Sequence, residues 1–564
     1  MRIVTGLAAS GKTSMLLREI AEKAEANRGR QILLVPELNS HQMERRLAAA
    51  THNHGARTAE VLTFSRLADR VFAVVGGLAQ QMLTPAGQLL TLQEAARRVQ
   101  VGLTAWSGLA DKPELLSETL ALIDECKSCM IEPETLFRAS EESALDEDAA
   151  LSAKLRDLAQ ILTQYDSLCG ETLPDPRDRL THLRDGLAES HVLDGAEVYL
   201  DGFLSYTPQE LAIIEVMLSS GVPLTAAVTC DVELPDVFVT GCRTLRTLTR
   251  MAERCSRRPE LVDLGAGKMP RPAGLAAVAN EALLPVRQAH EDASGVRLYE
   301  AASPFDECEH AAAYIRRKVR DEGAHYRDFV IAARDIGPYS ASLAMAMGRY
   351  DIPMFLADKP DLLSRPPMAL VIGALESVRS NFGCRELFGC LKTGLTGLAW
   401  DEIDRLENYA ITWKIHGAAW ERDWVEHPDG YGIPVDEAAQ AQLDELNELR
   451  ARAIAPFAAL RERLKGEQPS AECVRALYDF LLAVDAPRRM EERAAEHDAA
   501  GCLQLADEYR QLWEILVSAM EQFAWVRGDM PLTLDRFAQL FRLVLSGYSV
   551  GSIPVSLDRV SCGN

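Results

Sequence analysis

The first part of the chain alternates between short apolar runs and segments whose apolar residues have helical spacing. Residues 2–5, 30–36 and 58–64 each form a short apolar run, and a helical pattern follows each one. The first helical segment places five apolar side chains on one face: Leu16, Leu17, Ile20, Ala21 and Ala24. Buried strands that alternate with helices pair in a parallel sheet. The pattern therefore predicts an α/β domain at the N-terminus.

The strand signal is lost over about 80–190, where Leu-, Ala- and Glu-rich helical segments such as 88–101 and 150–167 dominate. It returns at 196–201 and 222–230. Because strands resume after the helices, we expect one parallel-sheet domain, residues 1–290, interrupted by a large helical insertion at about 80–190.

A second α/β unit is predicted in residues 291–564. The Gly- and Pro-rich stretch 264–273 is typical of a linker or surface loop. Strands are expected at 296–301 and 328–333, and helical patterning prevails after about 366. The last residues, VSCGN, show no capped element, so we expect this domain to be truncated at its C-terminus.

The composition, 48% hydrophobic and 25% charged, is that of a globular protein. No apolar stretch reaches the roughly 18–20 residues of a membrane span, and no signal segment opens the chain, so we expect a cytoplasmic protein with no membrane contact. Twelve cysteines are scattered, which indicates reduced thiols. Cys126 and Cys129 form the one C-x-x-C pair, which we interpret as helix cysteines because no second pair follows at zinc spacing.

Charge is distributed unevenly. The formal net charge of −23 argues against general coating of nucleic acid. Residues 1–76, however, carry 11 Lys and Arg against 7 Asp and Glu. The N-terminal end is thus the basic end, which favours an anionic partner there.

A phosphate-binding loop is predicted between the first strand and the first helix. Eight residues fit G-x-x-x-x-G-K-[ST] at every fixed position: Gly6, Leu7, Ala8, Ala9, Ser10, Gly11, Lys12 and Thr13. In such a loop the backbone N–H groups surround a polyphosphate, and the lysine reaches its β- and γ-phosphates. The Thr13 hydroxyl would bind Mg²⁺. The sequence therefore predicts binding of a nucleoside triphosphate, with ATP and Mg²⁺ as the expected ligands.

Asp201 is the predicted metal-side carboxylate, because it ends the apolar strand 196–201. Helicase-type motors place Glu directly after this Asp, whereas this chain has Gly202. Gln209 and Glu210 are possible substitutes for that Glu, but Pro208 before them also favours a plain helix start. Hydrolysis is therefore less secure than binding. The long separation between Lys12 and Asp201 suits a large DNA motor fold better than a small kinase.

Several segments together resemble the AddB family within the superfamily 1 helicases. The resemblance covers most of the chain and is carried by LLVPELNSHQMERRL (33–47), VLTFSRLADRVF (61–72), VYLDGFLSYTPQE (198–210), DFVIAARDIGPYSASLAMAMGRYDIPMFL (328–356) and KTGLTGLAWDEIDRLENYAITWKIHGAAW (392–420). The second and fourth are similar to helicase motifs Ib and IV. The third has Asp-Gly-Phe where helicases have Asp-Glu.

The resemblance implies a superfamily 1 helicase-like protein built from P-loop domains. It implies a subunit of an ATP-dependent helicase/exonuclease that processes double-strand DNA breaks and recognises Chi-type sequences. An AddA-type helicase/nuclease subunit would be its heterodimer partner, and single- and double-stranded DNA ends its substrates. The nuclease motif and a 4Fe–4S cluster would lie beyond residue 564.

The resemblance also suggests roles for individual residues. Arg334, after the strand of motif IV, would contact the γ-phosphate. Four residues of motif Ib would contact DNA: Thr63, Phe64, Ser65 and Arg66. Phe64 also suits a core position, His41 and Gln42 suit a surface helix, and Trp400, Trp413 and Trp420 suit packing of the helical region.

Three functions stay open at this point. One is an ATP-binding, DNA-handling subunit of a helicase/nuclease. Another is a stand-alone P-loop ATPase or kinase, which Gly202 disfavours. The last is a pseudo-helicase scaffold in which the nucleotide is structural. We adopt the first as the expectation.

Overall fold

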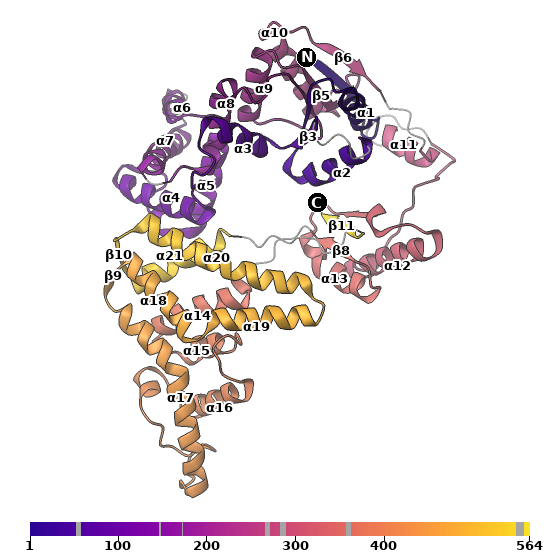
Figure 1. The fold of residues 1–564 in the computed structure, drawn as a ribbon. Coiled ribbons are helices and arrows are strands. Elements are labelled where there is room, and N and C mark those ends of the chain that lie inside the picture. The colour runs from indigo at the N-terminus through magenta and orange to yellow at the C-terminus, as the bar shows by residue number, and fades with distance from the viewer. Residues whose placement is uncertain are drawn as a thin grey trace. The chain divides into compact units, whose positions relative to one another are not determined.

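The computed structural model describes residues 1–51, 58–145, 148–171, 173–265, 271–281, 289–356, 362–548 and 558–563. The chain divides into two compact units (Figure 1). Unit 1 comprises Met1–Met82 and Thr119–Leu298, and unit 2 comprises Leu83–Glu118 and Tyr299–Asn564.

Unit 1 is built on a six-stranded sheet in the order β3-β2-β4-β5-β1-β6, and every pairing is parallel. The predicted parallel sheet is therefore confirmed. The strands are β1 (Arg2–Gly6), β2 (Arg30–Leu34), β3 (Ala59–Leu62), β4 (Ala196–Leu200), β5 (Leu224–Thr229) and β6 (Glu260–Asp263).

Helices cover both faces of this sheet. Alternate side chains of one strand point to opposite faces, so Ile32 and Leu34 join one buried cluster while Leu33 joins the other. The face with Leu33 is covered by α1 (Lys12–Glu25) and α2 (Ser40–Ala50). The face with Ile32 is covered by α3 (Phe64–Val75), α8 (Arg179–Ser190), α9 (Pro208–Ser219) and α10 (Val239–Arg254). The short α11 (Ala273–Glu281) follows β6.

The expected helical insertion is present but belongs to both units. In unit 1 it contributes α6 (Pro133–Leu145), α7 (Ala149–Glu171) and the end of α5 (Pro113–Ser128). Lys127 on α5 bonds Asp166 at 2.7 Å and Asp178 at 2.9 Å, which fastens α5 to α7. Cys126 is buried and Cys129 half-buried near the end of α5, and all twelve cysteines are free thiols.

Unit 2 contains a small parallel sheet in the order β7-β11-β8. Its strands are β7 (Val330–Ala332), β8 (Met354–Leu356) and β11 (Val560–Gly563), with α12 (Pro304–Glu322) and α13 (Ser340–Arg349) beside them. Ile315, Leu343 and Met347 are buried with Val560 in a common cluster.

The larger part of unit 2 is helical, as predicted for residues after 366. Its apolar cluster contains the fully buried Trp420 and has Trp413 packed at its margin, whereas Trp400 is 57% exposed, so the packing prediction is wrong for Trp400. The elements are α4 (Pro85–Val99), α14 (Pro366–Arg379), α15 (Cys384–Leu391), α16 (Trp400–Thr412), α17 (Glu437–Arg463), α18 (Ser470–Ala483), α19 (Ala486–Ala499), α20 (Leu503–Arg527), α21 (Leu534–Ser546) and the antiparallel pair β9 (Glu467–Pro469) and β10 (Pro531–Thr533).

Residues 83–118 of the expected insertion belong to unit 2, where α4 packs against α20 and α21. One expectation needs correction. The expected strand 296–301 is absent, since these described residues are almost all exposed and form no strand. Part of the predicted linker 264–273, residues 266–270, lies outside the described residues. Within the described part of the chain, every helix is too short or too polar to span a bilayer.

Candidate phosphate-binding site

The glycine-rich turn lies between β1 and α1, as predicted. Gly6 has a φ of +151°, and a Cβ there would lie 2.6 Å from the Ser10 hydroxyl oxygen and 3.1 Å from the Gly265 carbonyl oxygen. Gly11, at φ +98°, leads into α1. Only glycine suits both positions, because one is crowded and both lie in the left-handed region. The local geometry is thus that of a tight loop at the carboxyl end of a buried strand.

Lys12 points back into this loop. Its Nζ donates to the carbonyl oxygens of Gly6 and Leu7, each at 2.8 Å, and lies 3.5 Å from the Ser10 hydroxyl. Burial lowers the pKa of Lys12, while the negative charge of Asp201 opposes that shift. The ammonium therefore lies inside the turn, where it could contact a bound phosphate.

Asp201 lies just beyond β4 and beside Thr13. The residue is 4% exposed, and the Thr13 hydroxyl lies near enough to its carboxylate to lower its pKa. Its Oδ2 atom is buried and has no hydrogen-bond partner among the residues that the structure describes. Burial raises the pKa of Asp201, against the effect of Thr13 and of the charges of Arg46 and Lys12. The structure thus brings together the two residues predicted to face a metal ion.

This arrangement fits Mg²⁺. The ion prefers oxygen ligands and in nucleotide sites takes only one or two from the protein, leaving the rest to phosphates and water. Thr13 offers a hydroxyl and Asp201 an unsatisfied carboxylate oxygen. No group of three or more His, Cys, Asp or Glu occurs among the described residues as an all-protein metal site, and a P-loop site needs none.

The possible substitutes for the missing Glu have structural roles. Thr207 and Glu210 form a capping box at the start of α9, with the Glu210 carboxylate accepting from Thr207 N at 2.8 Å. Gln209 Nε2 donates to the Arg177 carbonyl at 3.0 Å and to the Thr181 hydroxyl at 2.9 Å. Both side chains are therefore engaged in holding α9, which matches the helix-start interpretation.

Arg271 contacts the loop directly, and no motif in the sequence indicated this contact. Its guanidinium donates to the Ala8 carbonyl at 2.8 Å. The segment that leaves β6 lies against the same loop, since Leu7 N donates to Gly265 O at 3.0 Å. Asp263 secures this segment by accepting from the Thr5 hydroxyl at 2.9 Å and from Gly265 N at 3.1 Å. An arginine thus lies at the mouth of the predicted phosphate site.

Arg334 is placed in unit 2, directly after β7. It lines a cavity of about 510 Å³ together with Glu307 and Tyr339, whose hydroxyl donates to Glu307 at 3.2 Å. Its predicted contact with the γ-phosphate stays a prediction.

The residues predicted to contact DNA lie at the start of α3. Thr63 is buried, and its hydroxyl caps α3 by accepting from Arg66 N at 3.2 Å. Phe64 is also buried and meets Phe203 edge-on, with ring centroids 5.7 Å apart. Phe203 in turn lies 4.9 Å from Tyr206. The core position of Phe64 is confirmed, and Phe203, in the segment after Asp201, is the half-buried aromatic ring that the sequence prediction missed.

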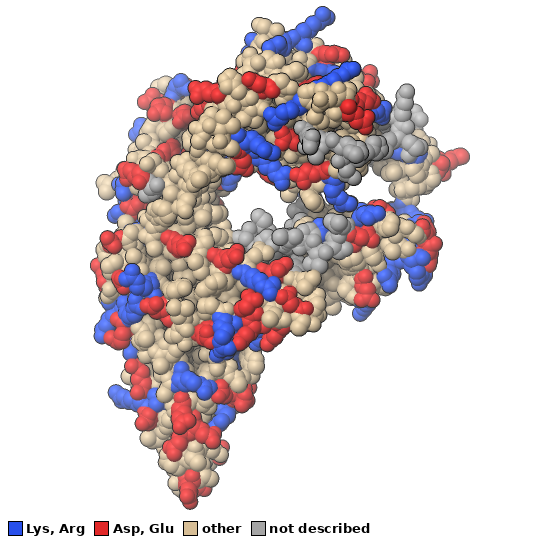
Figure 2. Space-filling view, viewed as in Figure 1, with Lys and Arg blue, Asp and Glu red and all other residues tan. Residues whose placement is uncertain are grey.

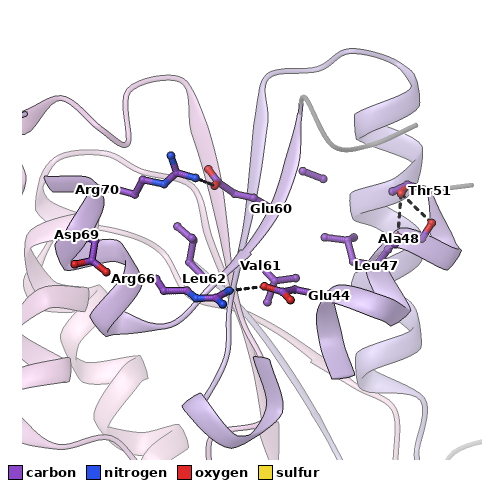
Figure 3. Close-up of a pocket in the computed structure, with 11 residues that line it drawn as sticks. Glu44, Leu47, Ala48, Thr51, Glu60, Val61, Leu62, Arg66, Asp69 and Arg70 are labelled. Atoms are coloured by element: carbon purple, nitrogen blue, oxygen red, sulfur yellow. Dashed lines mark hydrogen bonds and ion pairs between the residues drawn. The ribbon is translucent and has the colours of Figure 1, made fainter. Parts of the chain in front are cut away.

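Ser65 and Arg66 are exposed on the first turn of α3. Figure 3 shows Arg66 pointing across a hollow to Glu44 on α2, with which it forms an ion pair. The hollow, about 540 Å³, is floored by edge strand β3, and Arg70 pairs there with Glu60 at 3.1 Å. An exposed pair of this kind contributes only about 0–1 kcal/mol, so Arg66 can leave Glu44 for a phosphate at small cost.

Comparison with known proteins gives consistent relatives. Two proteins named as the B subunit of an ATP-dependent helicase/deoxyribonuclease, from Acetivibrio thermocellus and Desulforamulus reducens, are each 30% identical over the full length of the chain. The protein of that name from Clostridioides difficile is 29% identical over 99% of the chain. The chain spans about half the length of these curated relatives, 50% in each case.

The parallel sheet with helices on both faces, and the glycine-rich turn between β1 and α1, define an α/β protein. Residues 3–268 match the family described as ADDB, N-terminal. The chain is therefore an AddB homologue that covers the N-terminal half of these subunits, with residues 3–268 as its AddB N-terminal domain.

Proposed function

We propose that this chain is the ATP-binding, DNA-handling part of a helicase/exonuclease subunit that acts on double-strand DNA breaks for recombinational repair. The observation that carries the proposal is the glycine-rich turn with Lys12 folded into it, next to the buried Oδ2 of Asp201, which has no hydrogen-bond partner among the described residues. The homologous relatives, by their names, belong to an ATP-dependent helicase/deoxyribonuclease.

The residues would divide the work of binding. Backbone N–H groups of the loop and Lys12 would hold the phosphates, and Thr13 and Asp201 would hold Mg²⁺, which neutralises phosphate charge when bound. Arg271 would exchange the Ala8 carbonyl for a phosphate oxygen, to which a guanidinium binds more strongly. Because Gly202 carries no carboxylate and Glu210 caps α9, we expect tight binding with slow turnover.

DNA contact is proposed at the loops after β3 and β4. Ser65 and Arg66 offer donors to phosphates, and Phe203 with Tyr206 offers rings on which bases stack. Recognition of Chi-type sequences, cooperation with an AddA-type partner and a 4Fe–4S cluster elsewhere in the subunit belong to the same proposal through the family.

The test is ATP binding and turnover by the purified chain, with and without single-stranded DNA. We expect Lys12→Ala to abolish ATP binding. Arg271→Ala should weaken the binding of ATP at least about tenfold more than the binding of ADP, since one strong charge-assisted contact is lost. Arg334→Ala tests in the same way the predicted contact of Arg334 with the γ-phosphate. Binding that survives Lys12→Ala would overturn the proposal. DNA-stimulated turnover that Lys12→Ala removes would instead establish a working ATPase despite Gly202. Binding of ATP without any effect of DNA would favour the scaffold alternative.

A further inference from the structure

Helix α10 carries a stripe of arginines on the face that it turns to solvent. Its other face is buried in the core through Cys242, Leu245, Leu248 and Met251. Six exposed arginines lie on α10 and the turn after it, which we call the α10 stripe: Arg243, Arg246, Arg250, Arg254, Arg257 and Arg258. The first four recur every three or four residues, so they share one side of the helix over roughly 16 Å.

This stripe is a local exception in an acidic protein. The chain has a net charge of −23, yet residues 239–258 contain six arginines and a single acidic residue, Glu253. In Figure 2, Lys and Arg side chains project at the edge of the molecule where Figure 1 places α10, while elsewhere in the view both signs of charge are interspersed. Charge of one sign is thus gathered on one helix.

The positive charge of the stripe is left almost uncompensated. Among the residues that the structure describes, only Arg254 of the six forms an ion pair, with Glu215 at 3.3 Å. Arg246 and Arg257 donate to the backbone carbonyls of Cys242 and Leu218. On α19, by contrast, Arg488 is paired with both Asp485 and Glu492. An unpaired row of guanidinium groups repels itself and attracts a polyanion.

We propose that the α10 stripe is a docking surface for the sugar-phosphate backbone of double-stranded DNA. This rests on the DNA-handling function proposed above. The guanidinium fork matches phosphate oxygens in a bidentate manner, and the stripe consists of arginine alone, without lysine. A regular row of cations on a rigid helix matches the regular charge of a backbone better than it matches the irregular carboxylates of an acidic protein.

The absence of aromatic residues favours the duplex over a single strand. Single-strand sites combine positive charge with rings on which unpaired bases stack. Residues 239–258 contain no Phe, Tyr or Trp, whereas Phe203 and Tyr206 gather on the loop after β4. The α10 stripe is also separate from the phosphate loop, because α10 covers the sheet face opposite to α1. Stripe and phosphate loop can therefore be tested independently.

The decisive variant is Arg243→Gln, Arg246→Gln and Arg250→Gln together. None of these arginines forms an ion pair with the described residues, and glutamine keeps the helix propensity. The matched control removes three arginines that are paired with carboxylates in unit 2: Arg475→Gln, Arg488→Gln and Arg493→Gln. A third variant changes the same three stripe residues to lysine and so keeps the charge. Thermal melting and ATP binding report whether each protein is folded.

Binding of a fluorescent blunt duplex is measured by anisotropy across a salt series. We expect the stripe variant to lose at least about tenfold in affinity and its salt slope to fall by up to about 2.7, since each lost phosphate contact removes about 0.9. The control should change less than about twofold, and the lysine variant should keep the slope.

Each other outcome overturns the inference in a recognisable way. If the wild type binds the duplex and the stripe variant keeps its affinity and slope, the stripe is not the surface. If the stripe variant loses as much affinity for single-stranded DNA as for the duplex, the assignment to the duplex is wrong. If polyglutamate binding is lost instead, the face suits an acidic protein. A wild type that binds no DNA at all overturns the DNA part of the proposed function as well.

Discussion

At the scale of one residue, the Asp201 carboxylate destabilises the nucleotide-free protein but suits metal binding. Its carboxylate is buried with one oxygen unpartnered, and burial raises its pKa. A buried polar atom without a partner costs about 1–3 kcal/mol. The same atom is the one that a bound metal ion would use. A neutral side chain at this position would therefore favour the stability of the nucleotide-free protein, whereas a carboxylate would favour binding of Mg²⁺.

We expect Asp201→Asn to raise the free energy of unfolding of the nucleotide-free protein by about 1 kcal/mol, because the unsatisfied charge is removed. The same change should weaken Mg²⁺-dependent ATP binding at least about tenfold, since a charged ligand is lost. Urea unfolding and nucleotide titration measure the two effects. A variant less stable than the wild type without nucleotide would contradict the interpretation.

The pH dependence follows from the direction of the pKa. The folded-state pKa of Asp201 lies above its unfolded value, so the ionised carboxylate destabilises the fold. Below the unfolded value, about 4, wild type and Asp201→Asn should unfold with similar free energies. As pH rises through the folded-state pKa, the wild type should lose stability relative to the variant, and the difference should then stay constant. If the stability difference between wild type and Asp201→Asn grew on acidification, the pKa of Asp201 would be shifted in the opposite direction and the prediction would be wrong.

At the scale of elements, the sequence predicted those strands that are buried, because burial produces an apolar run. Strands β1 to β5 are apolar runs that are buried in the structure, and each was expected close to its observed bounds. Strand β6 was missed because Glu260–Asp263 is an exposed edge strand with no apolar run. Residues 296–301 have an apolar pattern but join no sheet. Arg271 reaches the loop through a tertiary contact, and no sequence spacing encodes such a contact.

The capping box of α9 gives a prediction at this scale. Thr207→Ala and Glu210→Ala should each lower the free energy of unfolding by about 1 kcal/mol, because each removes a partner from the first-turn N–H groups. Their effects should not add, since both break one reciprocal motif. ATP binding should stay unchanged, with Glu215→Ala on the same helix as control. Loss of turnover without loss of stability would instead give Glu210 a catalytic role.

At the scale of the whole molecule, the chain leaves unit 1 and returns to it. Residues 83–118 belong to unit 2, and Glu94 on α4 bonds Arg527 on α20 at 3.1 Å. Arg527 is 1% exposed, and burial lowers its pKa to about 10. Glu94 also pairs with Arg97 and Arg98. One buried carboxylate thus holds the inserted segment to the C-terminal helices.

We expect Glu94→Ala to lower the free energy of unfolding by about 3–5 kcal/mol, because it leaves the Arg527 guanidinium buried without its counter-charge. Hydrogen exchange should rise in α20 and α21, within the same unit. The exposed Glu114 of the same segment provides the control, and Glu114→Ala should change stability by less than about 0.5 kcal/mol. Equal effects of the two substitutions would show that the buried pair does not hold the segment.

The Glu94–Arg527 contact also sets a delay during synthesis. The two residues are 433 positions apart, and chains grow at about 5–20 residues per second. The side of α4 that packs against the C-terminal helices, including the fully buried Ala86 and Leu90, therefore emerges from the ribosome roughly 20 to 90 s before those helices are synthesised. During that interval the apolar side of α4 is exposed, and we expect the nascent chain to be prone to aggregation until α20 has been synthesised.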